Sequence, residues 1–393
     1  LMEDKVEEVP GLYGGVRVEE KVIQRIWSQS AFITHNLVSE EGQKLSILNA
    51  GTWNRSEEGP DFRNAVIWIE GEKKFGDVEI HFHERDWKNH GHDRDRNYNQ
   101  VILHVCLFPR SSSASRIVNS LGKEIPQLSL LPFLYQGLEE YNEEWTLASL
   151  SGRDQNLHTL AGAKPKNVED EILRLSHLRW VQKKAYAKKR IDQMGWEQAC
   201  HQWFLEVLGY PRNKKPMHEI ATLYSLEDWR VGLDVYRVYH PMTSWKKKGM
   251  RPANQPLNRL HQYQQIVEKV PHWPDELKAI HFPESSDPLE VNRTKLGIYP
   301  LRKKWRAQVL GGVLGSSKAD TLLIDSGLPL WAAYHEFDCF SLWYHWPSGD
   351  FSNDFRELAV EWGLKQRGKS LSNGVLQGLF QNFLLDQSKN SKQ

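Results

Sequence analysis

Residues 59–87 read GPDFRNAVIWIEGEKKFGDVEIHFHERDW, and this stretch decides the fold of the first third of the chain. It contains two runs rich in β-branched and aromatic residues, FRNAVIWIEG and FGDVEIHFHERDW, which predict two strands. The polar residues Gly71–Lys74 between them predict the connecting loop of a hairpin. The two strands are therefore expected to pair with each other.

Acidic and histidine side chains gather on one face of the second predicted strand. Side chains alternate along a strand, so Glu79 and His81 share a face with Asp77 and His83. Asp61 comes within a few residues of Glu79 across the hairpin, and a bulge or an offset register would align the two. Two such carboxylates can hold a hard divalent cation such as Mg²⁺. The same pattern is also typical of the solvent face of any antiparallel strand, so both interpretations stay open.

The segments on either side complete an α+β domain. Residues 16–29 have apolar side chains at helical spacing and predict an amphipathic helix that begins just after Gly14 and Gly15. The segment KLSILNAG alternates as a strand does, and VILHVCLF at residues 101–108 is an almost continuous apolar run, typical of a strand buried on both faces. We therefore expect a mixed sheet with flanking helices.

The second half of the chain has helical periodicity. Apolar and charged residues alternate at helical spacing over residues 168–209, and several shorter helical segments follow. The chain is thus expected to divide into an α+β domain at residues 1–135, a helix and linker at 136–167, and a mainly α-helical domain at 168–393.

Composition excludes several broad classes of protein. The 393 residues carry a formal net charge of +1, so any contact with nucleic acid must be a local basic patch. The three cysteines lie far apart without a CxxC pair, which argues against a structural zinc knuckle and for a reducing compartment. No run reaches the roughly 18 to 20 apolar residues of a membrane span, and the first residues are acidic, unlike a secretory signal. We therefore expect a cytoplasmic protein with no membrane segment.

The pattern around Asp61 and Glu79 resembles the motif of the PD-(D/E)XK nuclease superfamily. In that motif a proline-aspartate pair is followed by a hairpin and by an acid-x-lysine on the next strand. The resemblance implies a restriction-endonuclease-like fold and a hydrolase that cleaves the phosphodiester bonds of DNA with Mg²⁺ or Mn²⁺. Asp61 and Glu79 match the two metal-binding acids, and Glu20 on the opening helix matches an accessory catalytic acid. His81 stands where the superfamily has its lysine.

The histidine in the lysine position has a chemical consequence. Lysine supplies a permanent positive charge that offsets the charge of the transition state. The neutral imidazole of His81 can accept a proton or bind a metal, but it supplies no fixed charge. This difference favours the softer Mn²⁺, with His81 as a third metal ligand or as the base. It also fits an alternative, a catalytically inactive nuclease-fold protein that binds nucleic acid or a protein partner.

Over most of its length the chain also resembles a bacterial family described as domain of unknown function 2851. The resemblance rests on the segments LYGGVRVEEKVIQRIW, GPDF, GDVEIH, YNQVILHV and, in the second half, RPANQP. It implies no activity of its own. The functional expectation therefore rests on the nuclease motif and on the order of the strands.

Further histidines follow the motif. His90 and His92 flank a glycine in a polar segment, and His104 lies in the apolar run. Imidazole is a common ligand of transition metals, so these side chains could form a metal site for another hydrolysis. The alternative is a solvated turn and a hydrogen-bonded core histidine. Tyr98 either positions a base or a phosphate, or packs at the start of a strand.

Basic residues in the second half are candidates for contacts with DNA. Lys188 and Lys189 belong to a basic run in the long predicted helix. Lys247 and Arg251 lie in WKKKGMRPANQPLNR, where Trp245 could add a stacking surface. A solvated helix or loop surface is the alternative for either run.

Overall fold

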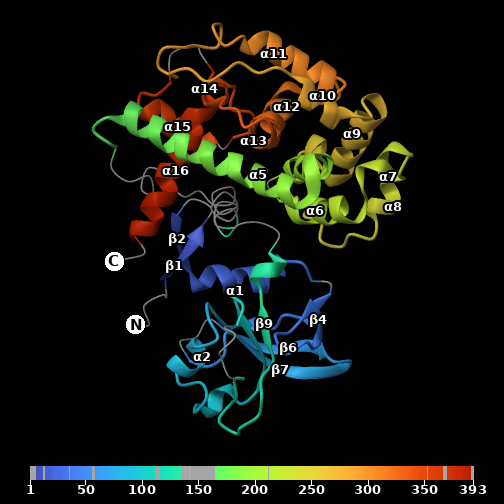
Figure 1. Cartoon of the computed structure of the whole chain (residues 1–393), viewed down its shortest axis with the longest axis vertical. Coiled ribbons are helices and arrows are strands. Elements are labelled where there is room, and N and C mark those ends of the chain that lie inside the picture. Colours follow the sequence, from blue (N-terminus) through green and yellow to red (C-terminus); the bar gives the residue numbers. More distant parts are fainter. Residues whose placement is uncertain are drawn as a thin grey trace. The chain divides into compact units, whose positions relative to one another are not determined.

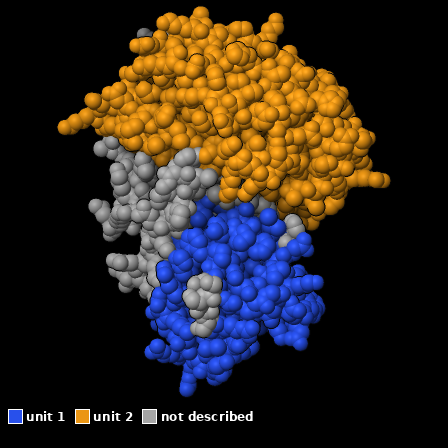
Figure 2. All heavy atoms as spheres, viewed as in Figure 1, with its two compact units in different colours: residues 1–145 blue, residues 146–393 orange. Residues whose placement is uncertain are grey.

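The computed structural model describes residues 6–11, 14–34, 36–54, 58–110, 116–134, 138, 141, 164–210, 212–351, 353–365 and 370–390. The chain forms two compact units, residues 1–145 and 146–393, which have different colours in Figure 2. The first unit contains the strands and the second contains most of the helices (Figure 1). Most of the linker expected at residues 136–167 lies outside the described residues.

The first unit is built on a mixed sheet, which confirms the expected α+β architecture. A separate antiparallel hairpin of β1 (Val6–Gly11) and β2 (Gly14–Glu19) precedes it. The sheet consists of β3 (Leu37–Val38), β4 (Lys44–Asn49), β5 (Thr52–Trp53), β6 (Phe62–Ile69), β7 (Glu72–His81), β8 (Val101–Cys106) and β9 (Gln127–Ser129). Its order is β3-β4-β6-β7-β8-β9, with β5 also paired to β6. The pairs up to β7 are antiparallel, whereas β8 is parallel to β7 and to β9.

The turn between β6 and β7 is tighter than the sequence suggested. Glu70 and Gly71 have φ values of 50° and 79°, both in the left-handed region, and the two strands pair up to this turn. The connection is therefore these two residues instead of Gly71–Lys74. A two-residue turn with both φ values positive matches the natural twist of paired antiparallel strands, which explains the difference.

A shift of register in β6 sets the relative position of the two candidate acids. Phe62 pairs with Val78, and the register has moved by one residue where pairing resumes at Ala65. Asn64 lies within the shift at a φ of 60°, and its N–H donates to Asp77 Oδ1 at 3.1 Å. This irregularity is the kind of bulge that aligning acids across the hairpin requires.

Helix α1 (Glu20–Ser28) begins later than the helix predicted from residue 16. Residues 14–19 form β2 instead, because their alternating sequence GGVRVE pairs with β1. The helix buries Ile23, Ile26 and Trp27 in the apolar core that β6, β7 and β8 also supply. It contacts β7, and its Gln24 side chain reaches Asp61 beside the hairpin.

The connection from β7 to β8 contains α2 (Asp86–Asn89) and a 3₁₀ helix, η1 (Arg96–Tyr98). A crossover is needed here because β7 and β8 run parallel. The side chains of Leu103, His104 and Val105 on β8 are fully buried, as the apolar run predicted. A further 3₁₀ helix, η2 (Leu131–Phe133), follows β9.

The second unit is mainly helical, which confirms the expectation for this half of the chain. Its longest helix, α5 (Val168–Leu208), bends at Gly195, whose φ of 79° is not helical. The other helices are α6 (Lys214–Leu223), α7 (Leu226–Arg230), α8 (Val235–Tyr239), η3 (Pro252–Asn254), α9 (Pro256–Lys269), α10 (Trp273–Ala279), α11 (Ile298–Lys304), η4 (Trp305–Val309), α12 (Ser316–Leu322), η5 (Leu323–Gly327), α13 (Leu328–Tyr334), α14 (Phe340–His345), α15 (Asn353–Glu361) and α16 (Asn373–Asn390). Helix α5 packs against α6, α13 and α16. Within the described ranges, no helix combines the length and apolar character needed to cross a membrane.

A buried ion cluster joins α5 to α6. The Glu206 carboxylate accepts hydrogen bonds from Arg190 at 2.9 and 3.0 Å and lies 2.8 Å from Nδ1 of His218. Lys214 Nζ lies 3.7 Å away. Burial alone would raise the pKa of Glu206, but the neighbouring cationic groups outweigh it and hold the pKa well below its usual range. The negative charge is therefore compensated inside the helical core.

We predict that Glu206→Gln lowers the free energy of unfolding of the helical unit by about 3 to 5 kcal/mol, because Arg190 loses its buried counter-charge. The matched control is Glu219→Gln, since Glu219 forms a partly exposed pair with Lys215 at 4.0 Å and should contribute less than about 1 kcal/mol. Urea unfolding followed by far-ultraviolet circular dichroism measures both.

The same carboxylate gives a pH dependence. A lowered folded pKa stabilises the protein above the unfolded pKa of glutamate, about 4.3, and this stabilisation is lost as the pH falls from there toward the folded pKa. The difference between wild type and Glu206→Gln should therefore shrink in acid. Equal stability of the two proteins at neutral pH would contradict the assigned role.

Candidate metal centre

Asp61, the residue before β6, lies beside Glu79 on β7. The backbone N–H of Asp61 donates to Glu79 Oε2 at 3.0 Å, and the N–H of Ile80 donates to Asp61 Oδ2 at 3.0 Å. Gln24 on α1 donates from Nε2 to Asp61 Oδ1 at 2.8 Å. The opposing strands and the helix thus hold both carboxylates in place.

The electrostatic surroundings of these carboxyl groups suit a bound cation. Burial raises the pKa of Asp61 well above its usual range, and the nearby Glu79 adds to the rise. Burial also raises the pKa of Glu79, and Glu20 at the start of α1 adds to it. The hydrogen bonds to the carboxylates act in the opposite direction without cancelling these effects. A divalent cation would favour the ionised form of both groups, so these residues fit such an ion.

His81 ends β7 and contacts the same carboxylate. Its Nε2 lies 3.4 Å from Glu79 Oε1, and its Nδ1 lies 2.8 Å from Nε2 of His104 on β8. Burial, together with two neighbouring histidines, lowers the pKa of His104 to about 3, so His104 is neutral at pH 7. When His81 donates its Nδ1 proton to His104, its Nε2 lone pair is available to a metal ion.

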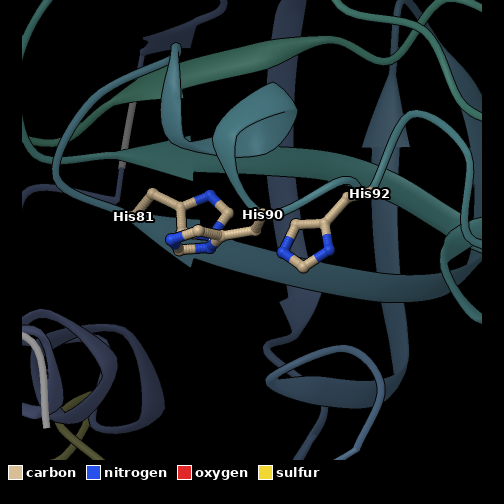
Figure 3. Close-up of side chains that lie close together, drawn as sticks. All are labelled: His81, His90 and His92. Carbon is tan, nitrogen blue, oxygen red and sulfur yellow. The ribbon is translucent and has the colours of Figure 1, made fainter. Parts of the chain in front are cut away.

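A tight turn brings His90 and His92 to His81. The N–H of His92 donates to the carbonyl of Trp87 at 3.0 Å, and Gly91 has a φ of 76°. Most side chains are strained at this φ, so glycine lets the chain reverse after α2. One ring nitrogen from each of the three histidines lies within 4.8 Å of the other two, and Figure 3 shows the rings gathered together. The polar segment is thus a turn that also carries candidate ligands.

Aromatic side chains enclose this group of histidines. Tyr98 stacks on His92 with ring centroids 3.7 Å apart, and Trp87 packs edge-on against His92 and His104 at 5.4 and 5.3 Å. Burial raises the pKa of Tyr98 well above its usual value, so it stays a neutral phenol. The sequence did not predict that Trp87 contacts these histidines, because its position depends on how the crossover folds back over β7 and β8.

Two residues predicted on the same strand face have other contacts. Asp77 Oδ1 accepts the hydrogen bond from Asn64 at the register shift. His83 follows the end of β7 and stacks on Phe108 with ring centroids 4.9 Å apart. Side chains alternate regularly only within a regular strand, so the irregular register at Asp77 and the strand end before His83 separate these residues from the cluster.

The basic candidates for contact with DNA lie in the helical unit. Lys188 and Lys189 are exposed on α5, and Lys247 and Arg251 are exposed in the segment before α9. Arg190, from the same basic run as the first pair, is buried against Glu206 instead. All four side chains are open to solvent, but Lys188 Nζ already lies 3.4 Å from Asp192 Oδ1 and 3.9 Å from Glu336 Oε1.

The family model described as "Protein of unknown function (DUF2851)" matches residues 20–234, more than half of the 393 residues. The chain belongs to this family. The matched segment of this family member begins at α1 and contains Asp61, Glu79 and the histidines beside them. No curated protein and no solved structure matches the chain.

We predict that Glu79→Gln stabilises the metal-free protein. The amide keeps an oxygen that can accept the Asp61 N–H but removes one of two neighbouring buried charges, so the free energy of unfolding should rise by roughly 1 kcal/mol. Thermal unfolding in the presence of a chelator measures the change. Asp77→Asn is the matched control on the same strand and should leave the melting temperature unchanged. A lower melting temperature for Glu79→Gln would mean that a positive group already balances Glu79.

Proposed function

We propose that this protein is a metal-dependent nuclease that hydrolyses phosphodiester bonds of DNA, with Mg²⁺ or Mn²⁺ bound by Asp61, Glu79 and His81. The observation that carries the proposal is the hydrogen bond from the Asp61 N–H to the Glu79 carboxylate, at the end of a hairpin with a shifted register. Glu20 lies close enough to raise the pKa of Glu79, which suits the accessory acid of a PD-(D/E)XK motif.

The order of the strands supports the same proposal. Strands β4, β6 and β7 are antiparallel neighbours, and β8 follows a crossover and runs parallel to β7. Helix α1 precedes these strands and packs on β7. A helix, three antiparallel strands, a crossover and a buried parallel strand are what we expect of a restriction-endonuclease-like fold.

Each residue has a separate role in the proposed reaction. A divalent ion supplies charge neutralisation at the phosphate and lowers the pKa of a water molecule bound to it. Asp61 and Glu79 would hold the ion, and Gln24 fixes the orientation of the Asp61 carboxylate through its 2.8 Å hydrogen bond. His81 would contribute its Nε2 as a ligand, while His104 holds the other nitrogen of the ring. The exposed basic residues of the helical unit bind the DNA backbone.

Cleavage of plasmid and single-stranded DNA tests the proposal. We predict that Glu79→Gln and His81→Ala each lower the cleavage rate by at least about 100-fold, because each removes a metal ligand. Mn²⁺ should support faster cleavage than Mg²⁺, since imidazole suits the softer ion. Asp77→Asn, a carboxylate change on the same strand outside the cluster, should keep the wild-type rate. Equal cleavage by wild type and Glu79→Gln would assign the activity to a contaminant or another site.

Binding of DNA to the helical unit has its own test. We predict that the double variant Lys247→Ala/Arg251→Ala weakens DNA binding and reduces the slope of log affinity against log salt by up to about 2. The control is Lys303→Ala/Lys304→Ala, which removes two exposed charges on α11. Fluorescence anisotropy with a labelled duplex in a chelator measures both. An unchanged salt slope would remove the segment before α9 from the proposed DNA surface.

One observation favours a second candidate function. His81 replaces the lysine of the motif and faces other histidines, so it brings no fixed positive charge to the reaction. A nuclease-fold protein that binds nucleic acid or a protein partner without cleaving it fits this feature. Salt-dependent DNA binding without cleavage in any metal would favour this candidate.

A further inference from the structure

Three histidines from two separate segments lie close together (Figure 3), and the Glu79 carboxylate lies within 3.4 Å of two of them. His81 ends β7, whereas His90 and His92 belong to the turn after α2. We propose that the imidazoles of these three residues, with the Glu79 carboxylate, bind one first-row transition-metal dication. This site shares Glu79 and His81 with the ligand set of the proposed nuclease and adds His90 and His92, but the binding of a metal here does not depend on nuclease activity.

The spacing of the ligand atoms matches a coordination shell. His81 Nε2 lies 3.0 Å from His90 Nδ1. Glu79 Oε1 lies 3.4 Å from the same His81 nitrogen and 3.2 Å from His92 Nε2. Ligands bound at about 2.0–2.1 Å are separated by about 2.9 Å in an octahedron and by about 3.3 Å in a tetrahedron. The three histidine nitrogens lie within 4.8 Å of one another, so some of these side chains must move closer together by up to about 1.5 Å to enclose an ion.

Neighbouring groups hold these ligands in position. The N–H of Asp61 donates a hydrogen bond to Glu79 Oε2 at 3.0 Å, while Glu79 Oε1 lies on the side of the histidines. His104 lies 2.8 Å from Nδ1 of His81, the ring nitrogen that would not bind the ion. Ligating histidines typically make such a bond through their second nitrogen, which fixes the tautomer and the orientation of the ring.

The donor set selects the type of metal. Mg²⁺ prefers oxygen ligands and keeps several waters, whereas three imidazoles and one carboxylate suit Zn²⁺, Co²⁺ and similar ions. We therefore expect Zn²⁺ and Co²⁺ to bind this site much more tightly than Mg²⁺. The carboxylate also offsets one of the two positive charges of the ion.

A metal-free explanation of the same cluster is a network of hydrogen bonds between histidines. The 3.0 Å separation of His81 Nε2 and His90 Nδ1 is also the length of a hydrogen bond. A shared proton then takes the place of the ion. Direct measurement of metal binding separates the two explanations.

The test is a titration of the chelator-stripped full chain with Co²⁺, followed by its visible absorption bands, and then competition with Zn²⁺ and with Mg²⁺. We expect one equivalent of Co²⁺ per chain, displaced by Zn²⁺ but not by Mg²⁺ at equal concentration. His90→Ala and His92→Ala should each weaken Co²⁺ binding by at least about 100-fold. The matched control is His83→Ala, which removes an imidazole two residues beyond His81 and should bind as wild type does.

Near-ultraviolet circular dichroism checks that each variant is folded, and His90→Gln replaces His90→Ala if the latter is not. Failure of folded wild type to bind Co²⁺, or equal binding by wild type and both histidine variants, would overturn the inference. The outcome is separable from that of the nuclease proposal. Intact Co²⁺ binding without DNA cleavage supports this site alone, and cleavage without Co²⁺ binding supports the nuclease alone.

Discussion

The candidate site in the first unit depends on a reciprocal pair of hydrogen bonds between Asp61 and β7. The N–H of Asp61 donates to the Glu79 carboxylate, and the Asp61 carboxylate accepts the N–H of Ile80. Each acid is thus part of the strand pairing as well as a candidate ligand. A slip of one residue would move alternate side chains to the opposite face, so the register that pairs Phe62 with Val78 also fixes the site.

The same arrangement places unfavourable charge in the fold. Burial raises the pKa values of Asp61 and Glu79, and a neighbouring carboxylate, Glu79 for Asp61 and Glu20 for Glu79, adds to each rise, so the ionised forms of both groups are destabilised. The Glu206 cluster in the helical unit is the opposite case, because cationic neighbours lower the pKa of its carboxyl group. The charge of Glu206 is therefore stabilised within the helical core, whereas the charges of Asp61 and Glu79 would be stabilised by a bound cation. Buried acidic groups with raised pKa values are typical of functional sites.

Local patterns predicted much of this structure. The β-branched and aromatic runs FRNAVIWIEG and FGDVEIHFHERDW predicted the hairpin, and the long apolar run predicted the buried β8. The sequence did not predict which distant segments pair with each other. The predicted start of α1 was wrong because residues 14–19 pair with β1. His90 and His92 reach the site at Glu79 through a turn whose direction is determined by packing. Sequence could identify these residues as metal-binding types, but not bring them together.

The central claim is that Asp61, Glu79 and the histidines beside them form a metal centre. The most direct measurement is a crystal structure of the protein soaked with Mn²⁺, with diffraction data collected to give an anomalous difference map. The account predicts an anomalous peak within bonding distance of Glu79 and of at least one of His81, His90 and His92. A fully ordered cluster with no anomalous peak, or with the peak at a distant surface site, would contradict it.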